Sequence, residues 1–508
     1  MKQRARLGWV LYASVLVIAT CGLVYELGAG AMATYLLGNS VTQFSLVIGT
    51  YLSAMGIGSW LSRYIERNLL ARFVEIEVGV ALIGGFHAPI LFWLFAWSPA
   101  FSFVLYGLVA LIGVGVGLEI PLLIRILEGR SELRELVARV LFLDYAGALI
   151  GSVAFPLLLV PQLGLLRTSL AFGLANAAVA LWGTFLFGEE EPPARRAWLT
   201  ALAATAVLVL SLGLVGAGAF EASVEARLFA DPVVFRTVTP YQQLAVTARG
   251  GDVRLFLNGA LQFSSVDEYR YHEALVHPAM IAHENPQAVL VLGGGDGLAV
   301  REVLRYPSVE HVTLVDLDPV VTRIFRERSD LAALNHDSLN DPRVSIVNAD
   351  AFTWLAEARD TYDVAIVDFP DPNDYGLGKL YTTQFYRLLS SHLAPGGVSV
   401  VQATSPMFSP NAYWCVVRTL EHEGFGTRPY HVYVPAFGEW GFILAAPGVV
   451  PPTTGSLPPE LRFLDRDTLG PMFVFPRDMA RRDGPIQRLD NQVLVRLYEQ
   501  DWRTLVSQ

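Results

Sequence analysis

The chain has 508 residues, more than one ordinary domain holds, so at least two domains are expected. Hydrophobic residues make up 53% of it and charged residues only 17%, well below the roughly 25% that is usual in soluble proteins. The net charge of -10 argues against nucleic acid as a partner, and the two cysteines, Cys21 and Cys415, lie too far apart in the sequence to indicate a disulfide framework or a cysteine zinc site.

Residues 1–220 are dominated by apolar stretches of about 20 residues with few charges, the length that crosses a bilayer core of about 30 Å. The seven stretches are 9–29, 42–62, 73–96, 101–124, 138–160, 168–187 and 198–219. A secretory signal peptide would give a single short run, so the repetition excludes that interpretation. We expect residues 1–220 to form a multi-pass α-helical membrane bundle.

Basic residues gather in alternate loops of this half. Lys2, Arg4 and Arg6 precede the first stretch, other arginines follow the second, fourth and sixth, and the remaining loops carry little besides Arg167. The positive-inside rule then places the N-terminus in the cytoplasm, and seven crossings would put the C-terminal half outside. The ligand inferred below is made and used inside the cell. We therefore expect a cell-membrane protein with a cytoplasmic catalytic domain, although the charge bias argues for the opposite side.

Several ionisable residues fall inside the apolar stretches. They are Glu26, Glu77, Glu119 and Asp144, with His87 near the end of one stretch. An acidic group in a bilayer is costly and often marks a cation path or a proton relay. Two interpretations stay open: these groups are hydrogen-bonded to neighbouring helices, or they form a cation site.

The second half reads as a soluble enzyme that begins with a connector and a small β subdomain over residues 221–285. Residues 243–248 and 253–258 are typical of short strands, and Gly250 and Gly251 between them indicate a hairpin turn. A helical stretch with Glu268, Tyr271 and His272 follows.

Residues 286–448 alternate buried strands with helices. The expected strands are 288–292, 311–316, 344–347, 363–367 and 397–402. Their continuous apolar runs suit parallel strands that are covered on both faces, and the alternation predicts a Rossmann-like doubly wound α/β sheet of the class I methyltransferase kind. Residues 449–508 form a C-terminal tail.

A glycine-rich turn ends the first of these strands. In Gly293-Gly-Gly-Asp-Gly297, glycines such as Gly293 and Gly295 permit positive φ and close approach of the backbone to a ligand. About 20 residues later Asp316 closes the second strand, where an acid accepts ribose hydroxyls. Asp350 ends the next strand, beside Ala351, and grips adenine, caps the following helix, or does both. The order of these motifs predicts a nucleoside site.

The charge of Asp296 indicates which nucleoside the site binds. A methyltransferase of this fold must hold the carboxylate of S-adenosylmethionine, and two like charges a few ångströms apart cost on the order of several kcal/mol at an effective dielectric near 20. Asp296 would repel that carboxylate and attract an amine, unless it serves only as a turn residue or helix cap. A ligand that has lost the carboxylate and kept the amine fits better.

Two acids follow the fourth strand, Asp368 and Asp371, at the edge of the sheet where ligands bind. Their spacing and the adjacent prolines suit a loop that closes over a cationic substrate. An amine nucleophile is mostly protonated at neutral pH, so its attack on carbon needs a base. Asp368 is the candidate for that base, and Asp371 is either a second amine contact or a turn residue.

Taken together, these motifs resemble the spermidine and spermine synthase family over about residues 232–448, in its bacterial form fused to a membrane bundle. The matching pieces are 241–243, 255–262, 267–273, 293–297, Asp316, Asp350 and 368–371. The family pattern departs at 434–442, which lacks the usual tyrosine of the acceptor pocket. Phe437 or Glu439 is expected to substitute for it.

The resemblance implies specific roles for these residues. Gln242, Asp316, Asp350 and Ala351 would hold the thioadenosine part of decarboxylated S-adenosylmethionine. Asp296, His272, Tyr271 and Asp371 would contact the amines, and Asp368 would accept the proton. No metal and no other cofactor is implied.

The resemblance therefore implies an aminopropyltransferase that acts on a polyamine, with putrescine as the expected acceptor, spermidine and methylthioadenosine as products, and a homo-oligomer as a possible state. Two alternatives stay open, a polyamine-binding membrane sensor or transporter and an S-adenosylmethionine-dependent methyltransferase. Asp368 favours the enzyme over the first, and Asp296 disfavours the second.

Overall fold

The computed structural model describes residues 2–37, 40–95, 101–128, 132–186 and 192–506. The chain separates into two compact units, Met1–Asp231 and Pro232–Gln508. Each unit is described by itself.

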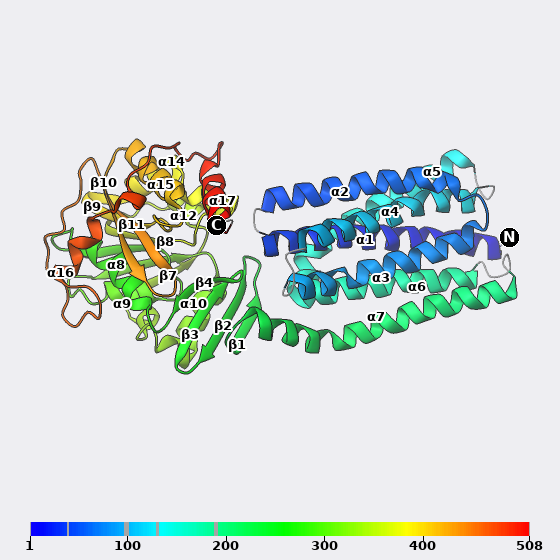
Figure 1. The fold of residues 1–508 in the computed structure, drawn as a ribbon, viewed down its shortest axis with the longest axis horizontal. Helices are drawn as coiled ribbons and strands as arrows, with labels where there is room; N and C mark the ends of the chain where they lie inside the picture. The colour runs from blue at the N-terminus through cyan, green and yellow to red at the C-terminus, as the bar shows by residue number, and fades with distance from the viewer. Residues whose placement is uncertain (1, 38–39, 96–100, 129–131, 187–191, 507–508) are drawn as a thin grey trace. The chain divides into compact units, whose positions relative to one another are not determined.

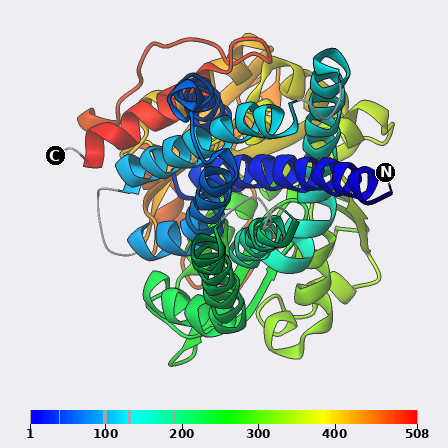
Figure 2. The same cartoon turned by 90° about the vertical axis from the view of Figure 1, so that its right-hand side faces the viewer.

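The first unit is a bundle of long α-helices, which Figures 1 and 2 show from two directions. Its helices are α1 Lys2–Leu37, α2 Ser40–Leu61, α3 Leu69–Phe95, α4 Phe101–Leu127, α5 Leu133–Ala154, α6 Val160–Leu186 and α7 Pro193–Leu228. The predicted apolar stretches fall on these helices, and the predicted ends at residues 96 and 187 lie outside the described residues. Six segments of the described chain are long and apolar enough to cross a membrane, and the longest of them, Leu133–Phe185, contains both α5 and α6.

The contacts between helices show that α5 and α6 run in opposite directions. Gly147 of α5 packs on Leu16 of α1, and Gly151 packs farther along α1, so these two helices are parallel. Gly173 and Gly183 of α6 pack on Gly85 and Val74 of α3, so α6 runs opposite to α3, whereas Tyr25 and Gly28 of α1 pack on Gly84 and His87 of α3, so α1 and α3 run the same way. Because α5 is parallel to α1, α5 runs opposite to α6. The chain passes from α5 to α6 through a π-helical turn, Phe155–Leu159, and a kink at Gly164, where φ is 73°.

The second unit begins with a small antiparallel sheet. Its strands, in order across the sheet, are β1 Val233–Val238, β2 Gln243–Arg249, β3 Asp252–Leu257 and β4 Ala260–Ser264. Gly250 and Gly251 both have positive φ between β2 and β3, as the hairpin signal predicts. The helix α8, Glu268–Met280, follows this sheet.

A seven-stranded sheet organises the rest of the unit, in the order β10-β11-β9-β8-β5-β6-β7. The five parallel strands are β5 Ala288–Gly293, β6 His311–Asp316, β7 Val344–Asn348, β8 Tyr362–Asp368 and β9 Leu393–Gln402. They coincide with the predicted strands. The sheet is mixed, however, because the hairpin of β10 Phe425–Val434 and β11 Gly438–Pro447 joins β9 in antiparallel pairing, which the expectation of a doubly wound sheet did not include.

Helices cover both faces of this sheet. The helices that follow α8 in this unit are α9 Leu298–Val303, α10 Pro319–Glu327, α11 Ser329–Ala332, α12 Ala351–Glu357, α13 Tyr375–Gly378, α14 Thr383–Ser391, α15 Pro410–His422, α16 Arg466–Leu469 and α17 Val493–Val506. Alternate residues of β5 face opposite ways: Val289 and Val291 enter one apolar core, and Leu290 and Leu292 enter the other. Burial on both faces explains why the strands read as continuous apolar runs.

Candidate active site

The glycine-rich turn after β5 lies against the ends of two other strands. Gly293 and Gly294 have φ of 81° and 67°, conformations that residues with a side chain rarely adopt. A Cβ on Gly293 would lie 2.1 Å from the carbonyl oxygen of Asp368, and a Cβ on Gly295 would lie 2.7 Å from the carboxylate of Asp316. The glycines are therefore required because the turn packs directly on the carboxyl ends of β6 and β8.

Asp316 closes β6 and is held by the backbone. One carboxylate oxygen accepts the N–H of Gly295 at 3.0 Å, and the other accepts the N–H of Asp318 at 2.9 Å. Burial raises the pKa of Asp316 to about 6, although both backbone hydrogen bonds act to lower it. Asp318 in turn accepts a hydrogen bond from the Gln242 side chain at 3.1 Å, which brings Gln242 to the same end of the sheet.

Asp350 follows β7 and has two partners. It accepts the N–H of Thr353 at 3.1 Å, which caps α12 at its first residue, Ala351, and it forms an ion pair with Lys379. Burial alone would raise the pKa of Asp350, but Lys379 and the cap outweigh burial and hold it below its usual value. The capping role that the sequence left open is thus present, and Lys379 is a neighbour that the sequence did not indicate.

Asp368 at the end of β8 is the centre of a buried polar group. The Tyr271 hydroxyl donates to Asp368 Oδ1 at 2.6 Å. Burial raises the pKa of Asp368 to about 6, His272 and the Tyr271 hydrogen bond act to lower it, and the nearby charge of Asp296 raises it. A carboxylate with this pKa is ionised at neutral pH and is a stronger base than an ordinary aspartate.

His272 lies beside this carboxylate and is oriented by Glu268 one helical turn earlier. His272 Nδ1 is 2.8 Å from a Glu268 carboxylate oxygen, and Arg301 binds the same carboxylate through two nitrogens at 2.9 Å each. Burial would lower the pKa of His272, but the hydrogen bond and charge of Glu268 outweigh burial and raise it. The sequence places Glu268 on a predicted helix and in the matching stretch 267–273 but gives it no role, although its spacing of four residues from His272 is the signal for such a contact.

Asp296 stabilises the turn, which is one of the two roles that the sequence leaves open, and its carboxylate is buried near other ionisable groups. Its Oδ1 accepts the N–H of Leu298 at 2.9 Å, so it does stabilise the turn. It also interacts electrostatically with His272, and burial raises its pKa. A turn residue alone would gain nothing from a place among buried ionisable groups, so its carboxylate belongs to the polar group around Asp368.

Asp371 is held by three donors from distant parts of the chain. Gln402 Nε2 donates at 3.1 Å, the Thr404 hydroxyl at 3.2 Å and the Tyr498 hydroxyl at 2.9 Å. Thr404 has a φ of 63°, an unusual conformation for a β-branched residue and one that costs on the order of 1–3 kcal/mol. Burial raises the pKa of Asp371, and the three hydrogen bonds act against that effect. No local sequence signal points to Tyr498, because it is 127 residues away from Asp371.

The hairpin between β10 and β11 forms one side of this group. The ring of Phe437 lies 6.2 Å from that of Tyr271 and 5.2 Å from that of Trp440. Glu439 is instead paired with His431 on the neighbouring strand. Of the two residues expected to replace the missing tyrosine, Phe437 lies next to Tyr271, whereas the carboxylate of Glu439 is already paired with His431.

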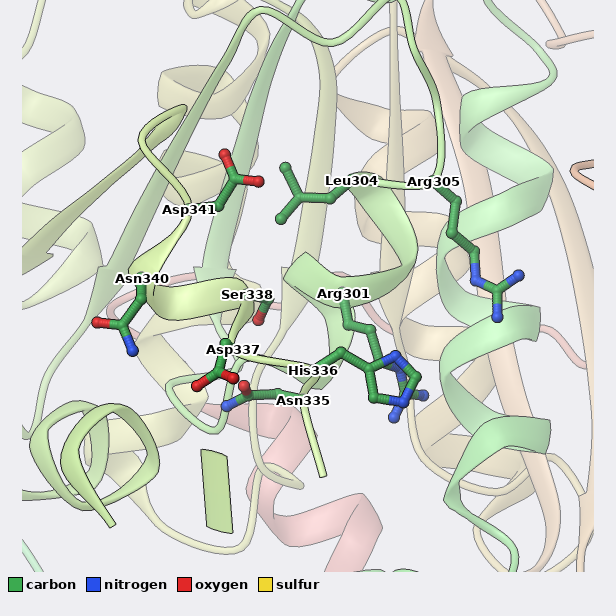
Figure 3. A pocket seen from close by; sticks show the side chains of 9 residues that line it. All are labelled: Arg301, Leu304, Arg305, Asn335, His336, Asp337, Ser338, Asn340 and Asp341. Atoms are coloured by element: carbon green, nitrogen blue, oxygen red, sulfur yellow. The ribbon is translucent and has the colours of Figure 1, made fainter. Parts of the chain in front are cut away.

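A pocket of about 400 Å³ is lined by residues of α9 and of the segment 335–341, and Figure 3 shows the side chains that line it. Two of its lining residues hold that turn: the Asn335 side chain donates to the carbonyl of Asp296 at 2.8 Å, and the Ser338 hydroxyl donates to the carbonyl of Gly297 at 2.8 Å. Arg301, which binds Glu268, also lines it. None of the predicted site residues lines this pocket, so its walls support the turn from outside.

The geometry suits a cationic ligand. Four carboxylates, Asp296, Asp316, Asp368 and Asp371, have pKa values raised by burial, and Asp296 raises the pKa of both Asp316 and Asp368. Placing a positive charge among them lowers their mutual repulsion. Among the residues that the structure describes, no group of three or more His, Cys, Asp or Glu side chains is arranged to hold a metal ion.

Comparison with known proteins identifies the family. The spermine/spermidine synthase domain matches residues 268–448. The polyamine aminopropyltransferase of Leptospira interrogans is 50% identical over 500 residues, covering 98% of this chain and 99% of that protein. Polyamine aminopropyltransferase 2 of Ralstonia nicotianae is 53% identical over 504 residues, covering 97% of this chain and 98% of that protein. A crystal structure of spermidine synthase in complex with the transition state analogue AdoDATO is 28% identical, with a TM-score of 0.45, and covers 48% of this chain and 85% of that chain.

These relatives are enzymes and align over nearly the whole chain, which sets aside the sensor, transporter and methyltransferase alternatives. The protein is an enzyme of aminopropyl transfer that uses decarboxylated S-adenosylmethionine as co-substrate, and it belongs to the polyamine aminopropyltransferase family of spermidine and spermine synthases.

Proposed function

We propose that the acceptor is putrescine, so that the enzyme makes spermidine and methylthioadenosine. The observation that carries this choice is the closed surrounding of Asp371. Its carboxylate accepts hydrogen bonds from Gln402, Thr404 and Tyr498, and the centre of the Trp502 ring lies 6.0 Å from that of Tyr498. An amine bound at Asp371 therefore meets a wall of side chains, which suits the end of a short diamine better than the middle of a longer polyamine.

The proposed reaction uses the carboxylates in two ways. Asp368 takes a proton from the amine that attacks, and the freed nitrogen forms a bond to the aminopropyl carbon next to the sulfonium. The carbon–sulfur bond breaks, and its electron pair stays on sulfur, so that methylthioadenosine leaves as a neutral thioether. Tyr271 and His272 orient Asp368 and the amines, Asp296 holds the aminopropyl amine, and Asp371 holds the far amine of the diamine. Positioning these groups in line supplies much of the rate.

The nucleoside would occupy the carboxyl ends of β5, β6 and β7. Gly293 and Gly295 permit close approach of the backbone, Asp316 would accept the ribose hydroxyls, and Gln242 would reach the same region. Asp350 and the N–H of Ala351 would contact adenine. Because Asp350 already binds Lys379, an adenine amino group has to share this carboxylate or displace Lys379.

A turnover assay on purified full-length protein tests the acceptor. Methylthioadenosine release is measured by mass spectrometry with decarboxylated S-adenosylmethionine and putrescine, cadaverine or spermidine in parallel. We expect the highest kcat/KM with putrescine, and we expect Tyr498→Ala to shift the preference toward spermidine because it removes part of the wall. Tyr433→Ala, at an exposed tyrosine, is the matched control. A wild-type preference for spermidine would exclude the diamine proposal.

We also propose that α1–α7 are inserted in the cell membrane. Their length and apolar composition support this proposal. The cytoplasmic location of the catalytic unit stays a prediction. The arginine distribution argues against it, because positive loops in the cytoplasm and seven crossing helices would place the catalytic unit on the opposite side of the membrane. Reporter fusions after α7 in intact cells decide it: activity of a cytoplasm-only reporter supports the prediction, and activity of a periplasm-only reporter overturns it.

A further inference from the structure

Two glutamates lie in the core of the bundle without a partner. Glu77 of α3 and Glu119 of α4 are 0% and 1% exposed. None of their four carboxyl oxygens has a hydrogen-bond partner among the residues that the structure describes. Burying a charged carboxylate without compensation costs several kcal/mol or more, so these groups need an explanation that packing does not give.

An amide from a third helix completes the group. Asn176 of α6 is 1% exposed and lies within interaction range of Glu77, which also faces Glu119. Both the nitrogen and the oxygen of the Asn176 amide lack a partner of good geometry in the described chain. The amide oxygen can only accept a hydrogen bond, and an ionised carboxylate has no proton to donate to it. A protonated glutamate would satisfy it.

The remaining polar neighbours carry no positive charge. Cys21 and Tyr25 of α1 interact electrostatically with both glutamates, and Tyr51 of α2 and Asp144 of α5 interact with Glu119. The two carboxyls and the amide offer about five oxygens at most, fewer than the six to eight that calcium takes. The described residues also contain no metal-binding group of three or more His, Cys, Asp or Glu side chains.

The two glutamates lie at the same depth in the bundle. Glu77 is eight residues after the start of α3 at Leu69, and Glu119 is eight residues before the end of α4 at Leu127. At 1.5 Å per residue, Glu77 is roughly 12 Å from the start of α3, and Glu119 is roughly 12 Å from the end of α4. In an inserted bundle this depth is near the middle of a hydrocarbon core of about 30 Å, where an acidic residue marks a proton or ion site.

From this geometry we propose a proton-binding site in the bundle, in which Glu77 and Glu119 share one proton and Asn176 bonds to the protonated pair. Two neighbouring carboxylates buried in a low-dielectric core cannot both be ionised, so the pair holds one proton. The site is separate from the aminopropyl-transfer site and does not depend on the identity of the acceptor amine.

A hydrophobic carbodiimide tests the site on the unaltered protein in lipid nanodiscs, since it reacts with protonated carboxyls. Labelling is mapped by peptide mass spectrometry across a pH series. We expect an adduct on Glu77 or Glu119 that decreases about tenfold per pH unit once the shared proton is lost. Labelling only at surface carboxyls, or labelling of the pair that does not change with pH, would overturn the proposal.

Infrared difference spectra supply an independent measurement. We expect Glu77→Gln and Glu119→Gln each to remove the carbonyl band of a protonated carboxyl that shifts in D₂O. Glu75→Gln, at a residue on the same helix that pairs with Arg72, should leave the band in place. All three variants should keep methylthioadenosine release within about twofold of the wild type. In the carbodiimide experiment, loss of the adduct when putrescine or sodium is added at constant pH would overturn the proposal, because it would show that a cation, and not a proton, occupies the site.

Discussion

Removing the Tyr271 hydroxyl should move the pH dependence of catalysis upward. This hydroxyl donates to Asp368 at 2.6 Å and favours the ionised form of the carboxylate, which has a pKa of about 6. Tyr271→Phe removes that stabilisation, so the pKa of Asp368 should rise further. Because the base must be ionised to take a proton, the acid limb of kcat/KM should move to higher pH by the same amount.

The size of the shift follows from the strength of one hydrogen bond. A hydrogen bond to a charged group contributes about 1.5 kcal/mol at the low end, and one pH unit corresponds to 1.36 kcal/mol, so the limb should move by about one unit. An acid limb that moves from about 6 to about 7 lowers kcat/KM at neutral pH by about twofold and at more acidic pH by up to about tenfold.

The assay is methylthioadenosine release at limiting substrate over a pH series from acidic to alkaline. Tyr413→Phe is the matched control, because its buried hydroxyl donates only to backbone carbonyls of Tyr430 and Phe442. An acid limb that stays in place in Tyr271→Phe, moves downward, or moves equally in the control would refute the assignment of Asp368 as the base.

Three further changes test other parts of the site. Asp368→Asn should lower turnover by about 10²- to 10⁴-fold while methylthioadenosine still binds in calorimetry, and a variant with normal turnover would contradict the catalytic role. Asp296→Asn should weaken binding of decarboxylated S-adenosylmethionine relative to S-adenosylmethionine, measured as the ratio of the two Kd values; an unchanged ratio counts against charge selection. Gly295→Ala should lower nucleoside affinity at least about tenfold, because its Cβ would lie 2.7 Å from the Asp316 carboxylate, whereas Gly470→Ala, with nothing within 4 Å of the added Cβ, should bind normally.

The parallel core of the catalytic unit could be predicted from the sequence because its physical signals are local. A strand covered on both faces must be apolar at every position, as in β5, and a turn that packs against neighbouring carboxylates must be glycine. The same locality explains why the sequence indicated a hairpin at Gly250 and Gly251. The division at residues 220, 285 and 448 and the roles of individual site residues stay predictions.

The parts that were missed depend on contacts between distant segments. The strands β10 and β11 pair with each other and with β9, but β10 contains Pro429 and lacks a regular burial pattern, so it gives no clear strand signal. Lys379 and Tyr498 reach Asp350 and Asp371 from 29 and 127 residues away. No periodicity within a short window encodes such pairs.

The position of α17 sets a lower limit on the length of any isolated catalytic fragment. Asp501 of this helix accepts three hydrogen bonds from the start of α15, from the backbone and side chain of Asn411 and the backbone of Ala412, which fixes α17 against α15. A fragment that stops at residue 448, where the matched domain ends, would lack this anchor and would leave Asp371 without its tyrosine donor. Recombinant versions of the second unit should therefore be designed from Pro232 through α17. A shorter product that folds well but turns over poorly would be an expected result of the truncation itself.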